Sequence, residues 1–298
     1  MILGFLLLIG TGICWAGLAA VMAAGSVRQV PASKIQPYSA LLVLLVCTLP
    51  GVIFGEALDF SRSWIQMICL LLAGSCNFFM LNLVQMGMKS GKNGVVWAFT
   101  QSSMMLPFMM GIICFGEKLT AFRLAGFLLI FFGLILFAKE KKGGGGGGKW
   151  LLPTVGAFLL SGIAQCFASL PSYFQVAGMS ALRRMLMTQC GIILAYLITA
   201  SLSRKVELPK LRAEKPVWIL AGIFGGLNLA ALLCFYRGLN LLADHGCASV
   251  GYPMGQGLGI ALFFVAGCIK NIPGTLSLCG FFLITAGIAS FVVNAFLN

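Results

Sequence analysis

Two apolar stretches of this sequence share one pattern of small and polar residues. The matching positions lie 151 residues apart: Gly74, Asn77 and Gly87 in the first stretch, Gly225, Asn228 and Gly238 in the second. A second match, 154 positions apart, joins segment 126–130 and Gly133 to segment 280–284 and Gly287. Internal duplication in an apolar chain is typical of secondary transporters, whose halves form the substrate site where they meet. The repeat therefore constrains the fold more than any single residue does.

Composition places the chain in a membrane. Hydrophobic residues make up 60% of the 298 residues and charged residues 9%, whereas a soluble domain carries about 25% charged residues. A helical crossing needs about 20 apolar residues, and lipid offers no partners to the backbone of open strands. The sequence therefore predicts an all-α polytopic membrane protein with ten transmembrane helices: 3–23, 38–55, 64–87, 93–114, 122–138, 151–172, 182–201, 216–239, 246–268 and 275–296.

The predicted helices divide into two repeats of five, residues 1–140 and 150–298, joined by a Lys/Gly-rich linker over 141–149. Because five is odd, the second repeat enters the membrane in the opposite sense, which makes the repeats inverted around a central cavity. The first apolar run lacks the basic region of a signal peptide, so we interpret it as a retained helix.

The net charge of +13 comes mainly from residues between apolar runs, which favours contact with lipid headgroups over binding of nucleic acid. Arg183, Arg184, Lys118 and Arg123 are among the basic residues assigned to loops. The cysteines lie in or beside apolar runs without metal-ligand spacing, so we expect neither a disulfide framework nor a metal site. No cofactor motif is present, and the expected partners are the bilayer and a small-molecule substrate.

The segment Phe115-Gly116-Glu117-Lys118-Leu119-Thr120, which leads into the helix of Gly126 and Gly133, together with the two five-helix repeats, resembles the drug/metabolite transporter superfamily. The second repeat departs from this motif at 270–274. The resemblance implies a central cavity lined mainly by helices 1, 3, 4, 6, 8 and 9, without implying one substrate. It also implies that both termini are cytoplasmic, whereas the loop charges favour the opposite orientation, so orientation stays open.

Polar and aromatic residues share faces on these six predicted helices. Helical phase groups Trp97 with Gln101, Tyr252 with Gln256, and Gln165 with Ser161, Ser169 and Ser172. Pockets combine aromatic walls with a few polar anchors. The predicted substrate-binding residues are Trp15, Asn77, Trp97, Gln101, Gln165, Asn228, Tyr252 and Gln256. The alternative for each is a hydrogen bond or packing contact between helices without a ligand, and for Asn77 and Asn228 the two interpretations are balanced.

All seven acidic residues fall in loops or at helix ends, and the only histidine, His245, precedes the ninth helix beside Asp244. Proton relays in membranes rely on intramembrane Asp, Glu or His. We therefore expect no coupling through a buried carboxylate, and His245 is a helix cap or, alternatively, a coupling residue.

These features predict a secondary transporter (a facilitator, exchanger or exporter) of a small uncharged or zwitterionic metabolite in the cell (inner) membrane. A structural or receptor-like membrane protein would give no reason for matched polar faces. A membrane-embedded transferase would need clustered acids. An enzyme is therefore not expected.

Overall fold

The computed structural model describes residues 1–53, 64–89, 93–139, 150–174, 180–202, 215–268 and 274–297, and every regular element in these ranges is helical. The α-helices and 3-10 turns (η), in chain order, are α1 (Ile2–Val27), α2 (Ala32–Ile53), α3 (Trp64–Met88), α4 (Asn93–Gln101), η1 (Ser102–Met104), α5 (Met105–Phe115), α6 (Ala121–Lys139), α7 (Leu151–Tyr173), α8 (Ala181–Leu202), α9 (Lys215–Ala243), η3 (Ala248–Val250), α10 (Gly251–Cys268) and α11 (Thr275–Leu297). The linker over 141–149 lies outside the described residues.

The fourth and ninth predicted spans contain 3-10 segments, and a proline accounts for each. Pro107 in α5 and Pro253 in α10 have no backbone N–H, so the carbonyl four residues earlier loses its helical partner. Those carbonyls belong to Ser103 in η1 and Ser249 in η3. The tighter turn therefore falls where each proline removes a helical hydrogen bond.

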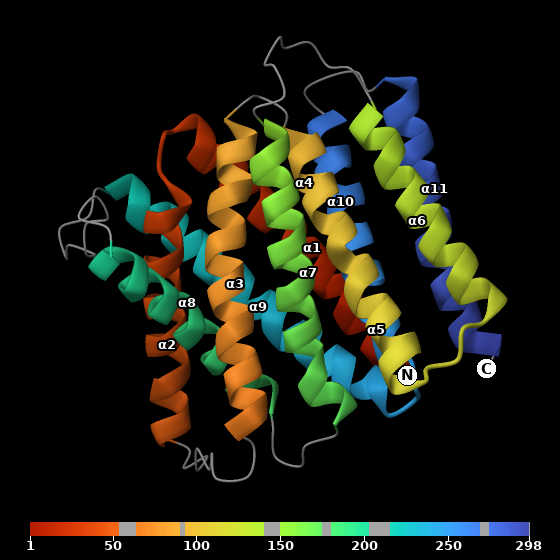
Figure 1. The fold of residues 1–298 in the computed structure, drawn as a ribbon, viewed down its shortest axis with the longest axis horizontal. Coiled ribbons are helices and arrows are strands. Elements are labelled where there is room, and N and C mark those ends of the chain that lie inside the picture. The colour runs from red at the N-terminus through yellow and green to blue at the C-terminus, as the bar shows by residue number, and fades with distance from the viewer. Residues whose placement is uncertain are drawn as a thin grey trace.

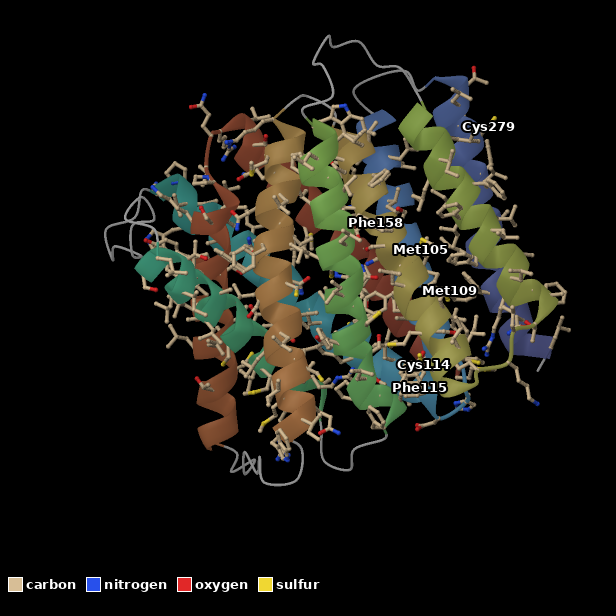
Figure 2. All side chains as sticks on the ribbon, viewed as in Figure 1. Met105, Met109, Cys114, Phe115, Phe158 and Cys279 are labelled. Carbon is tan, nitrogen blue, oxygen red and sulfur yellow. The ribbon has the colours of Figure 1, made fainter. Side chains whose placement is uncertain are left out.

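The described residues contain seven helices long and apolar enough to cross a membrane, and three shorter apolar helices at Ala32–Thr48, Ala121–Leu136 and Leu278–Asn294. Large apolar side chains also cover the outside of the bundle. Met109 of α5 and Cys279 of α11 are examples of side chains exposed on that surface (Figure 2). An apolar exterior of this kind suits lipid, and the chain is a polytopic helical membrane protein.

Helices α6 and α11 form a close pair at one side of the bundle (Figure 1). Glycines set their spacing: a Cβ added to Gly126 would lie 2.8 Å from the carbonyl oxygen of Gly287, and one added to Gly133 would lie 2.7 Å from that of Gly280. Small residues allow such close backbone approach in membranes. The four glycines of the second sequence match therefore meet in one interface.

The other major contacts also join the two sequence halves. Helix α3 packs on α7 and α8, α1 packs on α9 and α10, and α2 packs on α8 and α9. Both chain termini lie at the same end of the bundle, near the α5–α6 connection (Figure 1); we call this the termini end. One continuous buried apolar cluster runs through both halves, so the halves form a shared core.

Candidate functional site

Four aromatic side chains gather where α1, α9 and α10 meet. The ring of Trp15 stacks on that of Tyr252 at 6.2 Å between centroids and packs against Phe235 at 5.1 Å. Phe235 lies 4.5 Å from Tyr252 and 5.8 Å from Tyr236. We call Trp15, Phe235, Tyr236 and Tyr252 the aromatic cluster. It includes two of the predicted site residues, and it forms an apolar wall inside the bundle.

A polar stripe runs along α7 from the middle of the bundle to the termini end. It consists of Ser161, Gln165, Ser169 and Ser172, all buried. The Gln165 amide donates to Ser161 Oγ at 2.7 Å and, across to η1, to Ser103 Oγ at 2.9 Å. The Ser169 hydroxyl donates to the Gln165 carbonyl at 2.8 Å, and its side chain lies close to Tyr252. The predicted polar face of this helix thus lies against the aromatic cluster.

The remaining predicted site residues are distributed around this centre. Trp97, Gln101 and Gln256 are buried, whereas Asn77 and Asn228 are half-buried. No hydrogen bond between described residues links either asparagine to the aromatic cluster or to the polar stripe. None of the eight predicted residues is exposed, and their contact with a substrate stays a prediction.

Several buried polar atoms have no hydrogen-bond partner among the described residues. They include Oε1 of Gln165 and of Gln256, and both amide atoms of Gln189 in α8. An unsatisfied buried polar group costs about 1–3 kcal/mol, and native structures usually satisfy such groups with protein or water. Gln165 and Gln256, which flank the aromatic cluster on α7 and α10, are therefore suited to receive a polar ligand.

Arg184, predicted from the loop charges to lie outside the helices, is fully buried within α8. Its guanidinium Nη1 donates to Ser172 Oγ at 2.7 Å and to Asn240 Oδ1 at 2.6 Å, and Nη2 donates to the Ala168 carbonyl at 2.6 Å. The guanidinium also lies 4.3 Å from the centre of the Tyr236 ring. The loop assignment was wrong because α8 begins at Ala181, so Arg184 lies in its first turn and its side chain contacts α7 and α9 inside the bundle.

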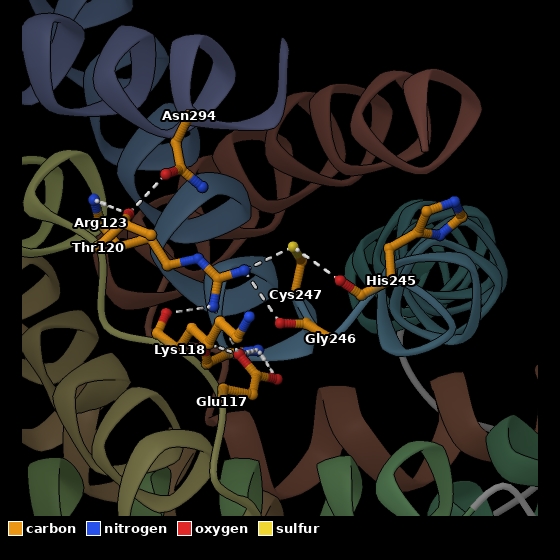
Figure 3. Close-up of polar contacts among 9 residues, drawn as sticks. Glu117, Lys118, Thr120, Arg123, His245, Gly246, Cys247 and Asn294 are labelled. Carbon is orange, nitrogen blue, oxygen red and sulfur yellow. Dashed lines mark hydrogen bonds and ion pairs between the residues drawn. The ribbon is translucent and has the colours of Figure 1, made fainter. Parts of the chain in front are cut away.

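Glu117 also lies deeper than its place in a turn suggested. Gly116 ends α5 at φ +66°, and the chain then directs Glu117 inward. The carboxylate pairs with Arg123 at 3.3 Å and accepts hydrogen bonds from the Ser249 backbone N–H and hydroxyl. Arg123 Nη2 donates to the Gly246 carbonyl at 2.9 Å and contacts Cys247 Sγ (Figure 3).

These residues form a polar connection between the first half and the second at the termini end. We call Glu117, Arg123, Gly246, Cys247 and Ser249 the latch. Thr120, next to Glu117 in the same turn, bonds Asn294 of α11. The Gly-Glu-x-Leu-Thr motif thus holds the α5–α6 turn against both η3 and α11, a role that its sequence alone did not disclose.

His245 is exposed in the α9–α10 turn, where Nδ1 lies 2.9 Å from the Leu241 carbonyl oxygen at the end of α9. His245 thus contacts the end of the eighth predicted helix and not the start of the ninth, which it was predicted to cap, while its alternative role in coupling stays a prediction. Within the described ranges no group of three or more His, Cys, Asp and Glu residues is placed to hold a metal ion.

A separate open groove of about 420 Å³ lies between α5 and α7. Met109 and Cys114, both visible along α5 in Figure 2, belong to its lining. The complete lining is apolar or sulfur-containing: Leu106, Met109, Met110, Ile113, Cys114, Ile163, Cys166 and Phe167. It lies on the outer surface and offers no anchor for a polar metabolite.

No protein-family model matches the sequence, and no curated protein matches it. Among solved structures, one described only as "Crystal structure of protein" aligns with a TM-score of 0.68 at 16% sequence identity. The alignment covers 98% of this chain and 97% of that one. The fold is therefore shared over its whole length with a protein of very different sequence.

Proposed function

We propose that this chain is a secondary transporter of a small organic metabolite, built from ten membrane-crossing helices in two inverted five-helix repeats. In this proposal it belongs with the drug/metabolite transporter superfamily and works in the cell membrane by alternating access. The proposal treats the chain as a carrier and not as an enzyme. Its substrate site is the region between the aromatic cluster and the α7 polar stripe.

The observation that carries the proposal is that residues matched by the duplication make matched contacts. A Cβ on Gly87 would meet Thr154 of α7 at 2.9 Å, and one on Gly238 would meet Gly4 of α1 at 3.2 Å. Gly87 and Gly238 are matched by the duplication, and Thr154 and Gly4 both lie in the first turn of the helix that begins each half. Exchanging the two halves therefore converts the first contact into the second. An inverted duplication gives this exchange, because each interface between the halves then occurs twice.

Other helix contacts are also converted into one another when the two halves are exchanged. Gly12 of α1 faces Leu258 of α10, while Gly162 of α7 faces Leu106 of α5. The α6–α11 interface maps onto itself, since the contact of Gly126 with Gly287 corresponds to that of Gly280 with Gly133. Both termini lie at one end of the bundle (Figure 1), as an even number of crossings requires.

Alternating access also needs an end that can open. The latch joins the two halves at the termini end through a few polar contacts, and in the carrier proposed here it would have to separate when the site opens to that side. The two prolines beside η1 and η3 leave backbone carbonyls free of helical bonds, which eases bending of these two helices.

Transport is tested with purified protein in proteoliposomes loaded with a defined mixture of amino acids, organic acids, sugars and nucleosides. Exchange of one class against the external labelled mixture, measured by mass spectrometry, is the expected result. Trp15→Ala should reduce exchange, while Gly222→Ala, at a position with nothing within 4 Å of an added Cβ, should not. Binding without any flux would favour the receptor-like alternative, and covalent change of a component would favour the transferase.

The mode of transport is proposed to be facilitated diffusion or exchange without proton movement through a buried carboxylate. A pH-sensitive dye inside the same vesicles tests this. Proton flux that persists in His245→Ala would overturn it, and flux abolished by that substitution would make His245 a coupling residue.

A further inference from the structure

Arg184 carries a buried positive charge, and no carboxylate among the described residues forms an ion pair with it. In the part of the chain that the structure describes, the recorded ion pair joins Arg123 to Glu117, and Asp244 is exposed. The acceptors around Arg184 are a hydroxyl, an amide and a backbone carbonyl. Charged side chains within a membrane protein are costly, and they usually pair or mark a substrate path.

Local dipoles stabilise the guanidinium in place of a carboxylate partner. Ser172 and Asn240 lie in the last turns of α7 and α9, so two helix C-terminal ends point toward Arg184. Each such end is equivalent to roughly half a negative charge. This arrangement favours a cation at the site and offsets much of its charge, so an anion would be held mainly by hydrogen bonds from the guanidinium.

Two N–H donors of the guanidinium have no recorded partner among the described residues. A guanidinium has five N–H donors, and the bonds to Ser172, Asn240 and Ala168 use both Nη1 hydrogens and one of Nη2. The buried Nε has no partner. Nε and Nη2 form the planar fork that binds a carboxylate through two parallel hydrogen bonds.

The surroundings specify what the anion is attached to. The guanidinium lies over Tyr236, which continues through Phe235 to Tyr252 and Trp15. We propose that the site binds a small organic carboxylate, with the carboxylate on the Nε–Nη2 edge of Arg184 and an apolar or aromatic body against the aromatic cluster. This inference rests on the proposed function and changes the expected substrate from an uncharged or zwitterionic metabolite to an anionic or zwitterionic one.

The experiment compares three related probes on the full-length protein in detergent: 3-phenylpropionate, its methyl ester and phenethylamine. L-Phenylalanine is added to test a zwitterion. Binding to the native state raises its melting temperature. We expect 3-phenylpropionate to raise it, and the methyl ester and phenethylamine to have no such effect.

Arg184→Gln should weaken carboxylate binding about tenfold to a hundredfold, the range for loss of charge-assisted hydrogen bonds. Arg184→Lys keeps the charge without the fork and should give an intermediate loss. Arg237→Gln is the matched control, because Arg237 is exposed on α9 and its loss removes the same charge. Should Arg184→Gln not fold, the Lys variant and the ester comparison still decide the question.

Equal binding of the ester and the acid, or unchanged binding in both Arg184 variants, would overturn the inference while leaving transport of another substrate class possible. Arg184-dependent carboxylate binding without flux in proteoliposomes would uphold the site and overturn the proposed transport. Failure of all four probes to bind the wild-type protein would overturn the aromatic-carboxylate class.

Discussion

The two arginines buried at the termini end of the bundle have opposite electrostatic surroundings. Arg123 is paired with Glu117, and its other contacts fasten the α5–α6 turn to the α9–α10 turn. Arg184 is held by neutral acceptors and an aromatic ring. Both are 4% exposed or less, so the difference does not arise from solvent. A neutralised arginine is suited to hold the fold together, and an unneutralised one is suited to receive an anion.

The largest expected effect is on the latch. Glu117→Ala leaves Arg123 buried without its counter-ion and removes the acceptor of the Ser249 N–H, so we expect a loss of about 3–5 kcal/mol in the free energy of unfolding. Chemical denaturation in detergent micelles measures it. The double variant Glu117→Met with Arg123→Met should recover much of the loss. Equal destabilisation in the double variant would show that the pair itself is not what stabilises the latch.

Removal of Arg184 should cost much less stability. Arg184→Gln eliminates a buried charge, and Ser172 still donates to Asn240 at 2.9 Å. We therefore expect a change in the free energy of unfolding within about 2 kcal/mol, measured in the same way without ligand. A loss as large as that of Glu117→Ala would make Arg184 a structural connector and remove the contrast between the two arginines.

Two substitutions at Tyr236 separate the contribution of its ring, which contacts the Arg184 guanidinium, from the contribution of its hydroxyl. The hydroxyl lies 3.0 Å from Thr188 Oγ1, and Tyr236→Phe should cost about 0.5–1.5 kcal/mol of stability for that lost hydrogen bond. The ring contact with the guanidinium remains, so 3-phenylpropionate affinity should change little. Tyr236→Leu removes the ring as well and should weaken binding further, as an isothermal titration would show. Equal binding by both variants would exclude a role for the ring.

The smallest effect concerns Cys247, which reports on the latch. Burial raises the pKa of the Cys247 thiol, although the neighbouring Arg123 guanidinium lowers it in part. The thiol should therefore stay protonated at neutral pH and react slowly with maleimide, because the thiolate is the nucleophile. Glu117→Ala should raise the labelling rate several-fold, followed by peptide mass spectrometry, whereas Arg184→Gln should leave it unchanged. A faster rate in both variants would mean that the two clusters open as one unit.

Sequence patterns located most of the helices, because each apolar run must satisfy its own backbone in lipid. The breaks beside Pro107 and Pro253 also follow from local chemistry. The shared face of Ser161, Gln165, Ser169 and Ser172 was predictable from helical phase, and these residues lie together in the structure. Their contact with a substrate is still a prediction, as are the roles of Asn77 and Asn228.

Arg184 and Glu117 lie deeper in the bundle than their sequence positions predicted. A charge next to a short connection looks the same whether it faces water or the bundle, so Arg184 and Glu117 were taken for surface residues. The hydrogen bonds of Arg184 come from α7 and α9, and those of Glu117 from η3, segments far away in the chain.

Sequence by itself determined the apolar helices, the duplicated glycines and the helix phase, because these depend on spacing along one segment. Tertiary structure decided which charges are buried and which of them are neutralised. That outcome depends on which distant helix ends and carboxylates come within hydrogen-bonding distance, and no single segment contains that information.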